Sequence, residues 1–146
     1  MQVTIRELIH EYPAHEGPKF STADDVAIES RFISDASKEF MVAFYLDTKN
    51  RVIAREIVSV GILNASLIHP REVFRSAIHC NAHAIVLVHN HPSGSAEPSQ
   101  QDKEVTQLLC KAGEIIGIEL LDHVVVGADG YKSAKEEQLI RAVVKT

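Results

Sequence analysis

The sequence contains no tryptophan, only two cysteines and no apolar run long enough to cross a membrane. Cys80 and Cys110 lie far apart and form no CxxC pair, so we expect buried, reduced thiols rather than a disulfide framework. The N-terminus also lacks the charged and apolar pattern of a signal peptide. These absences predict a cytoplasmic protein with no membrane partner.

Basic residues are too few and too scattered to predict a nucleic-acid-binding surface. Lys and Arg number 15 against 20 Asp and Glu, which gives a net charge of −5. Binding to a phosphate backbone requires a basic patch or stripe, so nucleic acid is not an expected partner of this chain alone. Hydrophobic residues make up 45% and charged residues 24%, a balance typical of a folded globular domain.

Apolar periodicity and turn residues predict strands alternating with helices, and hence an α/β domain built around a mixed sheet. One helix is expected to begin at Ser21 or Thr22, with Val26, Ile33 and Ala36 on its apolar face. Residues 1–20 are interpreted as an N-terminal extension and residues 21–146 as the domain. The other helices are expected at residues 69–80, 100–116 and 134–145, and the strands at residues 40–46, 52–60, 84–88, 119–126 and 131–133.

The segment of residues 89–102 carries the strongest chemical signal. His89 and His91 follow a short apolar strand, and residues two apart on a strand point to the same face. Asp102 falls in the first turn of the next helix, where the helix dipole favours a negative charge. Two imidazoles, one carboxylate and one water make a tetrahedral catalytic zinc site, and such sites are common at the carboxyl ends of strands.

A simpler interpretation of this segment stays open. Ser99 and Asp102 also have the spacing of a helix capping box, and histidines in loops often do no more than form hydrogen bonds. Short motifs of this kind give many false matches. A zinc deaminase is not indicated, because its HxE and PCxxC motifs are missing.

The spacing His-x-His, seven residues, Ser, two residues, Asp resembles the JAMM (MPN-plus, or JAB) metalloprotease motif. The surrounding text resembles the RadC branch of that superfamily over about residues 35–134, carried by residues 46–51, 69–72, 87–94 and 121–123. The resemblance implies a single α/β/α domain of the JAB1/MPN type, similar in architecture to cytidine deaminases. Full-length RadC proteins also have an N-terminal helix-hairpin-helix region. Residues 1–20 are too few for it, so we expect the JAB domain only.

The resemblance also implies roles for individual residues. It implies one Zn²⁺ per chain, held by His89, His91 and Asp102, with water at the fourth position. Glu39 matches the upstream glutamate that accepts and returns the proton of that water, and Glu56 is the alternative. Ser99 would donate a hydrogen bond to the oxyanion that forms during attack on an amide carbonyl.

The function that this resemblance implies is that of a zinc-dependent metallopeptidase or isopeptidase with a peptide or protein substrate. One alternative is a binding module that keeps a zinc site without turnover. Another is an accessory protein of DNA repair or DNA processing, which only the family name suggests. His123, on the strand of residues 119–126, is expected either to support the metal site or to be a hydrogen-bonded core histidine.

Overall fold

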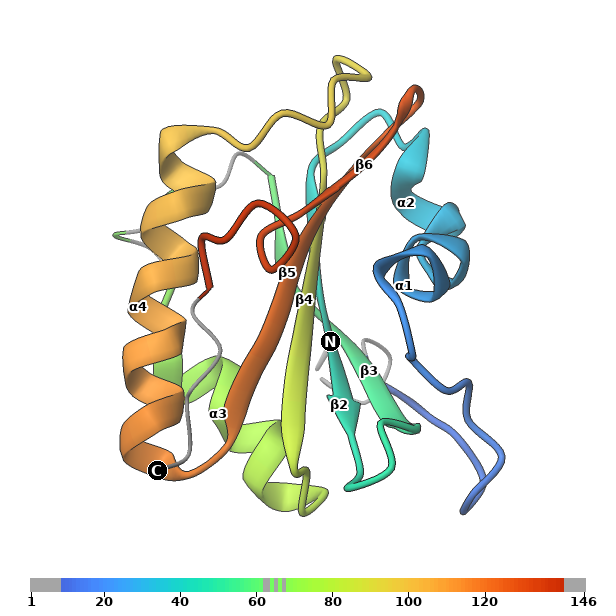
Figure 1. Cartoon of the computed structure of the whole chain (residues 1–146), viewed down its shortest axis with the longest axis vertical. Coiled ribbons are helices and arrows are strands. Elements are labelled where there is room, and N and C mark those ends of the chain that lie inside the picture. Colours follow the sequence, from blue (N-terminus) through green and yellow to red (C-terminus); the bar gives the residue numbers. More distant parts are fainter. Residues whose placement is uncertain (1–8, 62–63, 65, 67, 141–146) are drawn as a thin grey trace, which may run out of the picture.

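The computed structural model describes residues 9–61, 64, 66 and 68–140. In this part of the chain, six strands form one sheet in the order β1-β3-β2-β4-β5-β6. Helices α1 and α2 cover one face of the sheet, and α3 and α4 cover the other (Figure 1). This confirms the predicted α/β/α architecture. The elements are β1 (Ile9–Glu11), α1 (Ala23–Glu29), α2 (Arg31–Ser34), β2 (Phe40–Leu46), β3 (Val52–Val60), α3 (Pro70–His79), β4 (Ala84–Asn90), α4 (Gln100–Ile116), β5 (Glu119–Gly127) and β6 (Gly130–Ser133).

The sheet is mixed because one neighbouring pair, β4 and β5, runs parallel, while the other named pairs are antiparallel. Two parallel neighbours require a crossover connection, and α4 supplies it. This crossover brings the first turn of α4 beside the carboxyl end of β4, as Figure 1 shows at the upper end of the sheet. The connectivity thus positions a helix N-terminus at a strand end, the place predicted for the metal ligands.

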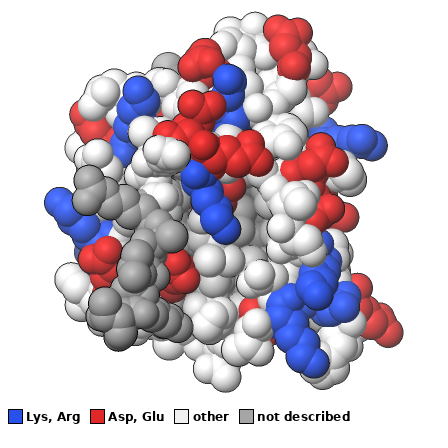
Figure 2. Space-filling model, in the orientation of Figure 1, with Lys and Arg blue, Asp and Glu red and all other residues white. Residues whose placement is uncertain are grey.

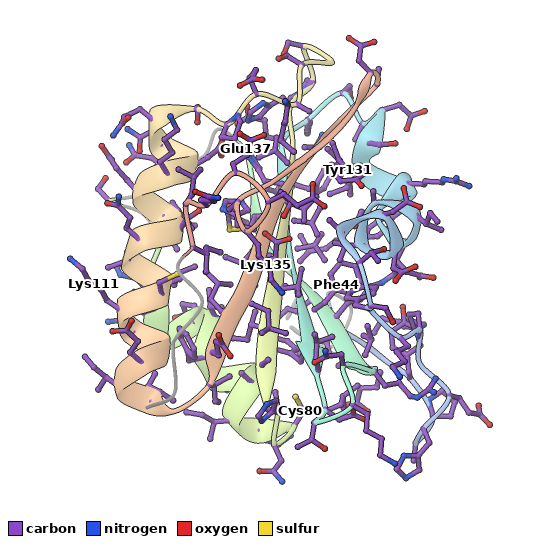
Figure 3. The ribbon with its side chains drawn as sticks, viewed as in Figure 1. Phe44, Cys80, Lys111, Tyr131, Lys135 and Glu137 are labelled. Carbon is purple, nitrogen blue, oxygen red and sulfur yellow. The ribbon has the colours of Figure 1, made fainter. Side chains whose placement is uncertain are left out.

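Strand β4 is buried along its whole length and separates two apolar cores. Ile85 and Leu87 belong to the core under α3 and α4. Val86 and Val88 belong to the core under α1 and α2. Phe44 on β2 also belongs to this second core (Figure 3). Its ring packs edge-on against the ring of Phe20, with the two ring centroids 5.1 Å apart. Because side chains alternate along a strand, the last two residues of β4 must also face opposite sides of the sheet.

The first predicted helix begins as expected but is interrupted. Thr22 caps α1 and forms a complete capping box with Asp25. The helix ends at Ser30, whose hydroxyl donates to the Val26 carbonyl at 2.7 Å, and α2 follows as a separate single turn. Val26 on α1 and Ile33 on α2 are buried in the same core, whereas Ala36, the third residue of the predicted face, lies beyond the end of α2.

The prediction of a helix at residues 134–145 is wrong for residues 134–140, which the structure describes. Residues 141–145 lie outside the described residues. Residues 134–138 form turns instead. The buried carboxylate of Asp122 anchors the start of this segment, because it accepts hydrogen bonds from the Lys135 N–H and the Ser133 hydroxyl. Gln138 then adopts a left-handed backbone with φ of 60°, which a continuing helix does not allow.

Part of the N-terminal extension joins the sheet. Strand β1 pairs with β3 in an antiparallel register, with Ile9 opposite Glu56. Lys19 forms an isolated bridge with Arg51, so residues on both sides of the proline- and glycine-containing turn contact the β2–β3 hairpin. The extension therefore supplies an edge strand to the domain.

The charged side chains of the described residues are interspersed rather than segregated by sign on the face drawn in Figure 2. One ion-paired group on this surface joins Lys132 to Glu97 and Glu137, at 3.6 Å in both cases. Within the described ranges, none of the helices combines the length and the apolar character that spanning a bilayer demands.

We predict that Asp122→Ala lowers the free energy of unfolding by about 3 kcal/mol, because it leaves the buried Ser133 hydroxyl and two backbone N–H groups without their acceptor. Urea denaturation followed by circular dichroism measures this loss. Asp122→Asn, which keeps an acceptor oxygen, should lose less. The exposed Asp129→Ala is the control and should stay within about 0.5 kcal/mol of the parent protein. An equal effect at both positions would contradict the role given to Asp122.

Candidate metal centre

The three predicted metal ligands meet in space. His89 lies near the end of β4, His91 follows that strand directly, and Asp102 lies in the first turn of α4. One potential ligand atom from each side chain lies within 4.8 Å of the other two. The Asp102 carboxylate sits between the imidazoles, with Oδ1 2.9 Å from His89 Nδ1 and Oδ2 2.9 Å from His91 Nε2. The group could therefore hold one metal ion.

The capping box of α4 fixes Asp102 in this position. The Ser99 N–H donates to Asp102 Oδ2 at 2.7 Å, and the Asp102 N–H donates to Ser99 Oγ at 3.1 Å. The simpler interpretation of this pair as a helix cap is thus correct, and it is compatible with a metal site. The cap holds the carboxylate rigidly, and the helix dipole stabilises its negative charge.

The loop between β4 and α4 is held against the end of β5. The His91 N–H donates to the Val126 carbonyl at 3.2 Å, which extends the parallel pairing by one residue. Further along the loop, the Gly94 carbonyl approaches Gly127 so closely that a Cβ atom at position 127 would collide with it. A glycine is therefore required at the end of β5 for the loop to fold back over the site.

A backbone contact places a hydrogen on Nδ1 of His91. Its Nδ1 lies 3.0 Å from the Ser95 carbonyl, and a carbonyl only accepts, so Nδ1 carries the hydrogen. In the neutral ring, Nε2 then presents a lone pair toward an oxygen of Asp102, which also only accepts. Two facing acceptors require a proton or a cation between them. A metal ion bound by His91 Nε2 and the Asp102 carboxylate would meet this requirement.

His89 gives a second, independent observation of the same kind. Its Nε2 atom is buried and has no hydrogen-bond partner among the residues that the structure describes. The Glu39 Oε2 atom lies 3.9 Å from it. A buried nitrogen without a partner is costly, and ligation of an ion is a common way to satisfy such a group.

The charge state of Asp102 suits a metal ligand. Burial favours its neutral form, but the hydrogen bonds from His89 and from the Ser99 N–H outweigh burial and hold the pKa of Asp102 well below its usual range. The carboxylate is therefore ionised at neutral pH. Only 1% of this side chain is exposed, so the negative charge is concentrated toward the two imidazoles.

His123 is connected to Asp102 through the Thr106 hydroxyl. It is buried on β5, and burial lowers the pKa of His123 to about 4, so the ring is neutral at physiological pH. Its Nδ1 lies 2.6 Å from the Thr106 hydroxyl, which in turn donates to the Asp102 carbonyl at 2.8 Å. The expectation of a hydrogen-bonded core histidine is confirmed, and the Thr106 partner of His123 contacts the first turn of α4.

Two carboxylates were predicted as alternatives for proton transfer, and the structure separates them. Glu39 lines a cleft of about 1020 Å³ together with His89, His91 and Ser99. Glu56 is instead buried in the core, where it accepts a hydrogen bond from the Tyr45 hydroxyl at 2.7 Å. Burial, and then the charge of Glu56, raise the pKa of Tyr45. Glu56 is thus a core partner of Tyr45 and lies outside the cleft.

Two polar residues of the site were not recognised in the sequence. Thr106 lies on the apolar face of α4 and Asn90 lies between the two histidines, and both are almost fully buried. The available signal was a polar residue at a position that the periodicity assigns to the core. Such residues require buried partners, and sequence alone does not identify those partners.

Comparison with known proteins agrees with this geometry. Residues 20–139 match the family model of the RadC-like JAB domain. A UPF0758 protein of Pelodictyon phaeoclathratiforme is 55% identical over 108 residues, which cover 74% of this chain and 49% of that protein. A UPF0758 protein of Chlorobium phaeovibrioides is 46% identical over 142 residues, covering 93% of this chain and 63% of the relative. One from Methanosarcina acetivorans is 43% identical over 121 residues, covering 83% and 53%.

The chain spans about half the length of the first curated relatives that it matches. The family match, by contrast, covers most of the chain, including both histidines, the carboxylate of α4 and the cleft beside them. The chain therefore belongs to the family of RadC-like JAB domains.

Proposed function

We propose that this domain is a zinc-dependent hydrolase that cleaves a peptide or isopeptide bond. The observation that carries the proposal is the arrangement at one side of the cleft. There, a metal-binding group of two histidines and one aspartate lies beside a glutamate whose Oε2 is 3.9 Å from His89 Nε2. Ligands and a proton-accepting carboxylate thus line the same open space.

Two imidazoles and one carboxylate suit zinc, and His89, His91 and Asp102 would be its three protein ligands. A structural zinc site is closed by four protein ligands, whereas a catalytic site keeps one position open. The group described here offers three side chains, and its edge reaches the cleft, because 13% of His91 and 23% of Glu39 remain exposed. These features favour a catalytic site over a zinc-containing binding module.

When bound, zinc would lower the pKa of a coordinated water to about 7 and so supply a nucleophile at neutral pH. Glu39 would accept the proton of the attacking water and pass it to the amine that leaves as the amide C–N bond breaks. The products are a carboxylic acid and an amine. Ser99 Oγ accepts a hydrogen bond from the Asp102 N–H but keeps its own hydrogen, which it can donate to the oxyanion in the cleft.

The metal assignment predicts about one zinc ion per chain in protein purified without chelators, measured by plasma mass spectrometry. Asp102→Ala should remove most of this zinc, because it leaves two neutral ligands and no charge. Asp129→Ala, an exposed aspartate on the β5–β6 turn, is the matched control and should keep the metal. Full zinc occupancy in the Asp102 variant would disprove the ligand assignment.

The proton-transfer assignment predicts that Glu39→Gln keeps zinc and lowers kcat at least about a hundredfold. The assay is hydrolysis of a library of fluorogenic peptides and isopeptide-linked peptides by the zinc-loaded chain. Glu56→Gln is the same chemical change at the carboxylate bound to Tyr45, and it should keep most of the activity. The reverse pattern would assign the base to Glu56.

The oxyanion assignment predicts that Ser99→Gly lowers kcat roughly a hundredfold, because it removes one preorganised donor. Glycine is a tolerated N-cap residue, so thermal denaturation should show a loss of only about 0.3 kcal/mol. Ser99→Thr keeps both the cap and the hydroxyl, and it should retain activity. If Ser99→Gly turns over substrate as fast as the parent, the role of Ser99 is limited to capping α4.

A further inference from the structure

The residue between the two metal-binding histidines is fully buried and faces the other side of the sheet. Asn90 is the last residue of β4 and has no exposed surface. Alternation along the strand places His89 on the α4 side and Asn90 on the side of α1 and α2. The residues that Asn90 contacts include Phe40, which packs against the core on that side.

The carboxamide of Asn90 binds the backbone on both sides of Glu39. Its Oδ1 accepts from the Phe40 N–H at 2.6 Å, and its Nδ2 donates to the Lys38 carbonyl at 2.9 Å. The Glu39 carbonyl itself accepts from the Gly61 N–H at 2.8 Å. Three hydrogen bonds therefore hold the peptide groups of residues 38–40, and two of them come from one side chain.

The orientation of this carboxamide is determined by its partners. A backbone N–H can only donate and a carbonyl can only accept, so the oxygen must face Phe40 and the nitrogen must face Lys38. The contact also begins where regular pairing stops, because the β2–β4 register ends at Met41 opposite His89. Asn90 thus continues the strand pairing with its side chain, just where the chain reaches Glu39.

We propose that Asn90 is a positioning residue that fixes the Glu39 carboxylate relative to the metal ligands. The inference rests on the proposed function, since it assigns a purpose to holding Glu39 still. The two histidines would hold the ion on one face of the sheet. Asn90, which lies between them and faces the other side, binds the backbone around Glu39. One tripeptide thereby contacts both parts of the site.

The hydrogen bonds can be tested in the unmodified chain, without metal or substrate. Nuclear magnetic resonance should detect a scalar coupling across the hydrogen bond between the Phe40 amide nitrogen and the Asn90 side-chain carbonyl carbon. In Asn90→Ala, the Phe40 amide should exchange with deuterium roughly tenfold faster. Val86→Ala, on the same strand and the same face, is the control and should leave Phe40 protected. Absence of the coupling in the parent chain would overturn the inference.

The positioning role is tested by the response of Glu39 to zinc. In the parent chain, zinc should shift the carbon resonance of the labelled Glu39 carboxylate, and this shift should shrink at least by half in Asn90→Ala while one zinc per chain is retained. Asn90→Asp keeps the acceptor for Phe40 but cannot donate to Lys38 when ionised, so its shift should be intermediate. An unchanged shift in Asn90→Ala, or loss of its zinc, would overturn the positioning role.

Hydrolysis gives the functional consequence. Asn90→Ala should lower kcat roughly tenfold to a hundredfold with little change in KM, because the base is displaced while the cleft is kept. Val86→Ala should keep the parental kcat. If the parent chain hydrolyses none of the substrates, the proposed function fails, and the Glu39 resonance still decides the positioning role. If Asn90→Ala does not fold, the coupling in the parent chain and the Asn90→Asp variant decide it.

Discussion

A buried carboxylate held between two imidazoles is the interaction on which the site and its surroundings depend. Asp102 is 1% exposed and lies 2.9 Å from a ring nitrogen of each histidine. Ionisation at such a position is unfavourable unless donors, a dipole or a cation compensate for burial. The chain supplies the capping box of Ser99 and the N-terminus of α4, and the support of Thr106 under the same turn. The crossover that connects β4 to β5 brings all of these groups to one strand end.

Strand β4 connects this site to the rest of the fold. Its apolar residues fill the cores on both faces, and its final residues continue the same alternation with polar groups. His89 therefore faces α4 and the metal centre, while Asn90 faces the segment that leads into β2. A strand that is packed on both sides leaves little freedom to either residue, since any rotation of the strand would disturb both cores.

Local signals predicted the local parts of this structure. The helix at residues 100–116 was predicted with its observed bounds, because its apolar period is regular and Gly117 ends it with φ of 86°. The β2–β3 hairpin was also predicted, since two apolar runs flank a polar turn. The turns at residues 134–138 were not, because periodicity does not reveal the left-handed backbone of Gln138. The break at Ser30 was missed because its side chain competes for a helix carbonyl, a contact that periodicity does not reveal.

The metal-binding group was predicted from the spacing of His89, His91 and Asp102 together with a family resemblance, and the capping box of Ser99 was expected, but the contacts of Asn90 and Thr106 were not predicted. Periodicity assigns position 90 to a core, and a core residue is expected to be apolar. An asparagine at that position breaks local consistency, and its partners lie 50 and 52 residues away in the sequence. Such violations are expected where function overrides packing, because a site needs buried polar groups that stability alone would remove. The same logic applies to the unpartnered Nε2 atom of His89, which a bound cation would satisfy, and to the facing atoms of His91 and Asp102, which need a proton or a cation between them.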